Sequence, residues 1–223
     1  EFQVSRPRVI EKESPEGLME PFEEAVIEVP EEFIGPVMEK MGLRRAEMIE
    51  MKPTDRGPVR LHFRVPARGL FGYRSEFLTD TRGTGIMNHL FAGWEPWHGP
   101  ISGRPSGALV ADRAGNSTGF AIYNLQERGE IFVAPGTPVY EGMIIGENAR
   151  PKDMDVNVTK EKHLTNMRKS TSEEGIRLMP PRVLSLEQAI EFINVDELVE
   201  ITPRNVRLRK RELTANQRRP TER

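Results

Sequence analysis

The sequence predicts an α+β protein with two domains, and three of its features support this prediction. The first hundred residues alternate between strand-like and helix-like hydrophobic periods, and the later part carries short apolar runs separated by Gly and Pro. A Gly/Pro-rich stretch, residues 94–105, lies between these parts. A chain of 223 residues accommodates two ordinary domains, and 37% hydrophobic residues is a globular rather than a disordered composition.

We expect three segments along the chain. Residues 1–21, with three prolines and many acids, are expected to form the end of a preceding domain and an extended connector. Residues 22–95 are expected to form the first domain, and residues 96–223 the second.

The first domain begins with a strand and a helix. Residues 24–29 (EAVIEV) alternate apolar and polar side chains, as a half-buried strand does. Pro30 and two glutamates then favour a helix start, because carboxylates stabilise the positive end of a helix. Gly42 is placed to end this helix, and its apolar face is formed by Phe33, Val37, Met38 and Met41.

Two strands in a row, a second helix and a last strand complete this domain. Their predicted positions, in that order, are residues 46–51, 59–65, 70–78 and 85–91. The order β-α-β-β-α-β is that of the ferredoxin-like fold, in which both helices cover one face of an antiparallel four-stranded sheet. The open face carries Arg60 and Arg64 but no row of aromatic residues, which argues against RNA binding by base stacking there.

Short strands dominate the second domain, which is predicted to be mostly β with one clear helix. Ser185 and Gln188 form a capping-box pattern at the start of that helix. Residues 150–182 show no secondary-structure pattern, and such long spans inside compact domains are often functional. The predicted strands are residues 108–111, 119–123, 131–133, 139–140, 143–145, 198–201 and 206–208.

Within that span, residues 157–171 (NVTKEKHLTNMRKST) form a basic segment. Its periodicity fits neither a helix nor a strand, and a single acid accompanies its cations. Ammonium, guanidinium and amide donors suit the phosphate and sugar oxygens of RNA. Composition alone favours a solvated loop, and this alternative stays open at this point. The candidate RNA-binding residues are Lys160, Lys162, His163, Asn166, Arg168 and Lys169.

A second basic cluster lies in the last predicted strand, where apolar residues alternate with arginines. A strand with one apolar and one cationic face either keeps the surface soluble or binds a polyanion, and the sequence leaves both readings open. The net charge of the chain is only −2, so a polyanion would be bound by local clusters. The candidate residues here are Arg207, Arg209, Lys210 and Arg211.

Several kinds of chemistry lack their usual residues in this sequence. Cysteine is absent, and the four histidines show no metal-ligand spacing. No phosphate-binding GxxxxGK[ST] loop and no NKxD pattern is present, so DRAG at residues 112–115 reads as a turn. No apolar run reaches the length of a membrane span. We therefore expect no catalytic residue, no metal or other cofactor and no membrane-spanning helix in this chain.

Long motifs in this sequence resemble one family of proteins. Residues 67–97 (ARGLFGYRSEFLTDTRGTGIMNHLFAGWEPW) resemble domain V of translational GTPases of the elongation factor G type. The later motifs NLQERG, VYEGMIIGEN, DVNVTKEKHLTNMR and PPRVLSLEQAIEFI are similar to one branch of these proteins, the TypA/BipA family. The matches extend over nearly the whole chain, and elongation factor G and LepA lack this second half.

The resemblance implies that the chain is the C-terminal half of a TypA/BipA-type translational GTPase. The GTPase domain, with GTP and Mg²⁺, would then lie in a missing N-terminal part, and this half would bind without catalysing. The resemblance further implies binding to the 70S ribosome or the 50S subunit, and roles in large-subunit assembly and in stress or cold adaptation. It also implies a monomer in the cytoplasm.

The resemblance also implies a role for the basic segment. In this family the matching loop reaches the peptidyl-transferase region, where it meets rRNA and the acceptor end of A-site tRNA. Lys160, Lys162, Arg168 and Lys169 match the family's motif. His163 departs from the lysine expected there, which replaces a fixed charge by a titratable one.

Two other functions remain as alternatives at this point. A protein–protein interaction module without direct RNA contact would use the acidic N-terminal region or a sheet edge. It would bind a protein partner in a salt-insensitive manner and would not bind ribosomes. A cryptic hydrolase would need titratable groups that converge in a pocket, and no sequence motif supports one.

Overall fold

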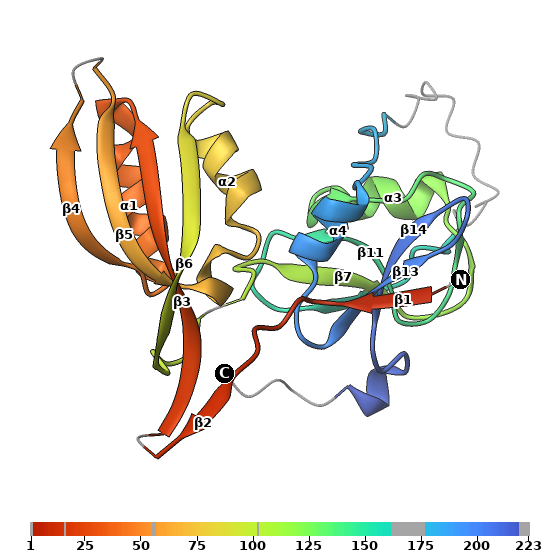
Figure 1. The fold of residues 1–223 in the computed structure, drawn as a ribbon. Helices are drawn as coiled ribbons and strands as arrows, with labels where there is room; N and C mark the ends of the chain where they lie inside the picture. Colours follow the sequence, from red (N-terminus) through yellow and green to blue (C-terminus); the bar gives the residue numbers. More distant parts are fainter. Residues whose placement is uncertain (1, 16, 55–56, 102, 162–176, 219–223) are drawn as a thin grey trace. The chain divides into compact units, whose positions relative to one another are not determined.

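The computed structural model describes residues 2–15, 17–54, 57–101, 103–161 and 177–218. The chain forms two compact units (Figure 1). The first unit is Pro7–Gly103, and the second unit joins Glu1–Arg6 to Arg104–Arg223. The first six residues, expected to belong to the end of a preceding domain and a connector, therefore contribute to the second unit.

The first unit is an antiparallel sheet with two helices, and the predicted ferredoxin-like arrangement is confirmed. Its strands run in the order β6-β3-β5-β4, and the short β2 extends one end of β3 as a hairpin. In chain order the elements are β2 (Lys12–Ser14), β3 (Gly17–Val29), α1 (Ile34–Leu43), β4 (Glu47–Pro53), β5 (Val59–Pro66), α2 (Tyr73–Asp80) and β6 (Ile86–Pro96).

One face of this sheet is buried under both helices. Alternate side chains of β3 and β5 point to that face, as the period of two in a strand requires. Large apolar side chains of α1 and α2 fill the space against them. The core consists of Ala25, Ile27, Val29, Phe33, Val37, Met41, Leu61, Phe63, Val65, Tyr73 and Phe77.

Both helices of the first unit begin later than predicted. A 3₁₀ turn, Glu31–Phe33, follows Pro30 and leads into α1. Ala67–Leu70 form another 3₁₀ turn, and Gly72 then has φ 71°, a left-handed conformation that cannot continue a helix. α2 therefore starts at Tyr73 rather than at residue 70.

The second unit is built on a seven-stranded sheet. Its strands run in the order β1-β13-β14-β11-β7-β12, β9 pairs with one end of β11, and β8 and β10 form a separate pair. The elements are β1 (Phe2–Ser5), β7 (Gly107–Ala111), β8 (Gly115–Asn116), α3 (Gly119–Leu125), β9 (Gly129–Ile131), β10 (Pro138–Val139), β11 (Met143–Asn148), β12 (Met154–Val156), α4 (Leu186–Phe192), β13 (Glu197–Ile201), β14 (Val206–Lys210) and the 3₁₀ turn Ala215–Gln217.

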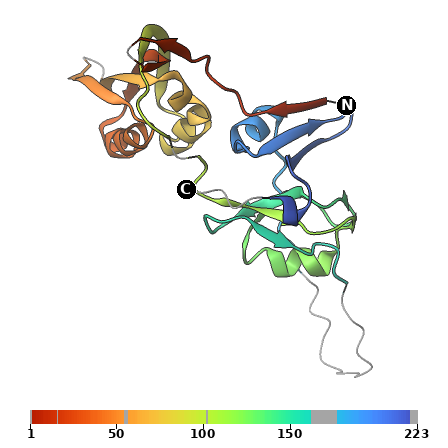
Figure 2. The ribbon, with the colours of Figure 1, turned by 90° about the horizontal axis from the view of Figure 1, so that it is seen from below.

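The centre of this sheet, at β7 and β11, is buried on both faces, because α3 covers one face and α4 covers the other (Figure 2). Along β7, Leu109 and Ala111 belong to the core under α3, whereas Ala108 and Val110 belong to the core under α4. A strand covered on both sides has no solvent face, so its sequence (GALVA) is an unbroken apolar run instead of an alternating one.

The prediction of a strand at residues 119–123 is wrong, because these residues form the helix α3. The Thr118 hydroxyl caps the helix by accepting a hydrogen bond from the N–H of Ala121 (3.1 Å). Ile122 and Leu125 then point to the core at helical spacing. The apolar run GFAIY fits the period of a strand as well as that of a helix. The capping residue Thr118 was the signal in the sequence that favoured a helix.

Two other predictions for the second unit have different outcomes. The helix predicted after Ser185 is confirmed as α4, and both hydrogen bonds of the capping box with Gln188 are present. The span 150–182, expected to be irregular, contains β12 in parallel with β7. Within the part of the chain that the structure describes, no helix is both long and apolar enough to cross a membrane.

Candidate nucleic-acid interface

The upstream flank of the basic segment is attached to the start of α3. Val158 is 1% exposed in the core under α3, and its carbonyl accepts a hydrogen bond from the N–H of Thr118 (3.0 Å). The Thr118 hydroxyl donates to the carbonyl of Lys160 at 2.5 Å. The residue that caps α3 therefore also holds the backbone of the basic segment.

The downstream flank is attached to the other end of the same helix. Leu178 packs against the core under α3. The N–H of Met179 donates to the side-chain oxygen of Gln126 (2.7 Å), which directly follows α3. The N–H of Arg182 then donates to the carbonyl of Ile131 (2.9 Å). Both flanks are thus fixed by contacts with α3 and the strand that follows it.

The structure describes one of the six candidate residues in the basic segment. Lys160 is exposed, next to the Thr118 contact. The other candidates lie outside the described residues, so their role in RNA binding stays a prediction. They are Lys162, His163, Asn166, Arg168 and Lys169.

The basic cluster of β14 divides between the two faces of its strand. Arg207 and Arg209 point to one face, whereas Leu208 and Lys210 are buried on the other. The Arg209 guanidinium donates to the carbonyls of Lys210 and Arg211 (3.0 and 3.1 Å). Arg211 is exposed. Three of the four predicted cations are therefore at least partly accessible.

The expectation that Lys210 binds RNA is not supported by its surroundings. Lys210 is 2% exposed, and its Nζ donates to the carboxylates of Glu197 (2.8 Å) and Asp196 (2.9 Å). The carboxylate of Asp153 lies 2.5 Å away. Strand alternation places Lys210 on the face of Leu208, so it points into the unit and not toward a ligand.

Lys210 belongs to a buried network of ions in which charges compensate one another. Arg104 donates to both oxygens of Glu197 at 3.2 Å, and Glu197 is fully buried. Burial opposes the charge of Lys210, but Glu197 and its neighbours raise the pKa of Lys210 above its ordinary value. Burial also opposes ionisation of Asp153, yet hydrogen bonds from Lys210 and the backbone hold the pKa of Asp153 below its usual value. This network ties the β13–β14 hairpin to the turn before β12.

The open face of the sheet in the first unit carries compensated charges. Arg60 donates two hydrogen bonds to Glu28 (2.6 and 2.8 Å), and Arg64 is paired with Glu95. Each of these two arginines already has a carboxylate partner. Neither is therefore an unpaired positive charge that could bind RNA.

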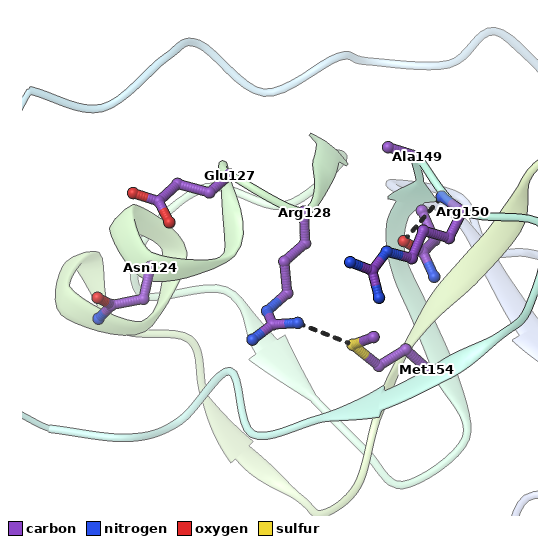
Figure 3. Close-up of a pocket in the computed structure, with 7 residues that line it drawn as sticks. Asn124, Glu127, Arg128, Ala149, Arg150 and Met154 are labelled. Atoms are coloured by element: carbon purple, nitrogen blue, oxygen red, sulfur yellow. Dashed lines mark hydrogen bonds between the residues drawn. The ribbon is translucent and has the colours of Figure 1, made fainter.

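Two arginines that were not among the predicted RNA-binding residues line a pocket of about 410 Å³ in the second unit (Figure 3). Arg128 follows α3, and Arg150 lies in the turn between β11 and β12. They are far apart in the sequence, and each stands in a turn, where a charged residue is ordinary. The pairing of β9 with β11 brings them to the same pocket.

The DRAG motif does not fit a nucleotide site. Asp112 pairs with the neighbouring Arg113 (2.8 Å), and the chain continues into β8 rather than into a phosphate-binding helix. Among the described residues, no three His, Asp or Glu side chains gather closely enough to hold a metal ion.

Comparison with known protein families shows which class of domain the first unit belongs to. Residues 17–104 match the family described as "Elongation factor G C-terminus". The match contains the whole βαββαβ arrangement of the first unit, so this unit is a C-terminal domain of the elongation factor G type.

The second unit then identifies the particular family. Residues 106–215 match the family described as "TypA/BipA C-terminal domain". The two matches follow each other in the order that the resemblance predicts, and the chain belongs to the TypA/BipA family.

Relatives from three bacteria carry the name "Large ribosomal subunit assembly factor BipA". The Bacillus subtilis protein is 48% identical over 219 residues, which is 98% of this chain and 36% of that protein. The Synechocystis protein is 47% identical over 210 residues, 94% of this chain and 35% of that protein. The Salmonella typhimurium protein is 44% identical over 220 residues, 98% of this chain and 36% of that protein. The chain thus spans little more than a third of the length of these relatives.

Proposed function

We propose that this chain is the ribosome-binding C-terminal region of a TypA/BipA-type translational GTPase, and that it contacts rRNA and the acceptor end of A-site tRNA. The observation that carries the proposal is the basic segment, whose described flanks are anchored on α3 within a unit that matches the TypA/BipA C-terminal domain. The name of the relatives supports the 50S subunit as the target. Roles in large-subunit assembly and in stress or cold adaptation, a monomeric state and a cytoplasmic location belong to the same proposal.

The proposed contacts are electrostatic and do not read a base sequence. Each Lys or Arg that binds a phosphate releases counterions, so affinity falls as salt rises. Contacts with phosphates and 2′-hydroxyl groups position the unit on folded RNA by shape. The residues proposed to make them are Lys160, Lys162, His163, Asn166, Arg168, Lys169, Arg207, Arg209 and Arg211.

In this proposal, GTP and Mg²⁺ bind to the part of the parent protein that lies outside this chain. This chain has neither the phosphate-binding loop nor the guanine-binding pattern of a GTPase. Its own residues bind and position RNA. Turnover of GTP by the purified chain would contradict this division of roles.

Co-sedimentation with 50S subunits and 70S ribosomes tests the proposal. In the test variant, four cations of the basic segment become alanine. We expect its affinity to fall at least about tenfold at low salt, and the slope of log affinity against log salt to decrease by about 3, because roughly 0.7 counterion is released per contact. The changes are Lys160→Ala, Lys162→Ala, Arg168→Ala and Lys169→Ala.

A matched control removes four exposed cations elsewhere and should keep both the affinity and the slope. Equal behaviour of the two variants would overturn the role of the basic segment. The control changes are Lys52→Ala, Arg60→Ala, Arg74→Ala and Arg113→Ala.

A protein–protein interaction module is the second candidate function, and the edge strand β4 favours it. Every residue of β4 is exposed, including Met48, Ile49 and Met51. Exposed apolar residues on a sheet edge are typical of a surface that pairs with another protein. This candidate requires binding to a protein partner that is insensitive to salt and is lost in a Met48→Lys/Ile49→Lys variant, and it requires no binding to ribosomes.

A further inference from the structure

The pocket in Figure 3 gathers two guanidinium groups from separate elements. Arg128 and Arg150 point into the same space, whereas the carboxylate of Glu127 points away from both. The remaining lining residues are Asn124, Asn148, Ala149 and Met154.

Backbone hydrogen bonds hold the two arginines next to each other. The carbonyl of Arg128 accepts a hydrogen bond from the N–H of Ala149 (2.9 Å). The N–H of Arg150 donates to the side chain of Asn148 (3.2 Å), and the carbonyl of Arg150 accepts from the N–H of Gly107 (2.7 Å). Both arginines therefore project from backbone that is held at a defined separation.

Two glycines make this arrangement possible, because the backbones approach too closely for any other residue. A Cβ atom at Gly129 would lie 1.8 Å from the carbonyl oxygen of Glu147. A Cβ atom at Gly107 would lie 2.2 Å from the carbonyl oxygen of Lys152. The first glycine brings the strand after Arg128 against β11, and the second brings β7 against the turn that carries Arg150.

The two guanidinium groups have no carboxylate partner among the described residues, in contrast with Arg104 and Arg182, which pair with Glu197 and Glu130. The side chain of Arg128 donates to the Met154 sulfur, a weak acceptor, at 3.7 Å. Two like charges held side by side repel each other, and an anion between them removes that cost. Guanidinium groups bind phosphate oxygens through pairs of N–H donors.

We propose that Arg128 and Arg150 form a phosphate cradle that holds one phosphodiester group of an RNA backbone. The choice of RNA rests on the proposed function. A backbone phosphate fits better than a free nucleotide, because no lining residue is aromatic and a base would have nothing to stack on. The cradle also lies at the end of α3, the helix that anchors both flanks of the basic segment.

Side-chain NMR of the 223-residue chain tests the cradle without the ribosome. The arginine Nε–Hε signals are followed during titration with an RNA hairpin of about ten base pairs, with GMP and with inorganic phosphate. We expect the signals of Arg128 and Arg150 to shift together, and to saturate at an RNA concentration at least about tenfold below that needed for GMP or phosphate. The signal of Arg113, which is paired with Asp112, should stay in place. No shift of the two signals, or equal saturation by GMP, would overturn the cradle.

Co-sedimentation with 50S subunits provides the second arm. The Arg128→Met/Arg150→Met variant loses two phosphate contacts. The slope of its log affinity for 50S subunits against log salt should therefore decrease by about 1 to 2, and the affinity itself should fall several-fold. The control Arg74→Met/Arg113→Met removes the same charge from exposed positions and should behave as the unchanged chain. If the two variants behave alike, the cradle is wrong. If the unchanged chain itself fails to bind subunits, the proposed function is wrong, and the NMR titration still decides the cradle.

Discussion

Lys210 and Arg207 lie on the same strand but in different surroundings. Lys210 is 2% exposed among carboxylates, whereas Arg207 is partly exposed on the other face. A buried charge is stable only when its partners remain, because water cannot replace them. The two residues look alike in the sequence, and burial alone gives one a structural role and leaves the other accessible to a ligand.

Replacing Lys210 separates these two roles. Lys210→Met leaves Glu197 with one cation fewer in a fully buried position, so the free energy of unfolding should fall by about 3 kcal/mol. The control Arg207→Met removes the same charge from a partly exposed site and should cost less than about 1 kcal/mol. Urea denaturation measures both values. At a temperature where Lys210→Met is folded, its RNA affinity should equal that of the unchanged chain, and a selective loss of affinity would restore Lys210 to the RNA-binding residues.

At the scale of elements, α3 is the helix on which the candidate interface depends. Thr118 at its start and Gln126 at its end bind the two flanks of the basic segment, and Arg128 of the cradle follows directly. Its position depends in turn on β9, which pairs closely with β11 through Gly129.

Gly129→Ala tests this close approach. The new Cβ would overlap the carbonyl oxygen of Glu147, at 1.8 Å, so β9 must move away from β11. We expect the free energy of unfolding to fall by about 2 to 3 kcal/mol. The control Gly119→Ala places a Cβ at an ordinary 3.7 Å from Leu178 at the start of α3, and should change stability by less than about 0.5 kcal/mol. Equal stability of the two variants would show that the strands can separate at no cost.

At the scale of the whole molecule, the chain consists of two units, and one of them is formed by two separate stretches of the sequence. Residues 2–5 form β1, which pairs with β13 at the edge of the sheet in the second unit. The chain then forms the whole first unit before it returns to the second at Arg104. The second unit therefore depends on a strand from the opposite end of the sequence.

Deleting residues 1–6 should affect one unit and leave the other unchanged. The second unit loses the four residue pairs of β1 with β13, so its free energy of unfolding should fall by at least about 1 kcal/mol. The first unit is formed by Pro7–Gly103 without these residues and should keep its transition midpoint. Scanning calorimetry resolves the two transitions. A shift of both midpoints by the same amount would contradict this division into units.

Much of the fold and part of the candidate interface follow from local patterns. The βαββαβ order followed from alternating runs such as VRLHFRV, and α4 followed from its capping box with Ser185. The run GFAIY satisfied two periods at once, and for this reason α3 was predicted as a strand. β12 is only three residues long, too short to show a period.

The sequence by itself determined the family, the ferredoxin-like order of the first unit and the basic character of residues 157–171. These properties depend on residues near one another along the chain, where period, caps and motifs are visible. The tertiary structure decided that Lys210 is buried, that α3 holds both flanks of the basic segment and that Arg128 and Arg150 line the same pocket. These properties depend on pairings between distant strands. These pairings determine which side chains are buried away from water. Burial in turn determines whether a charged residue stabilises the fold or remains accessible to a ligand.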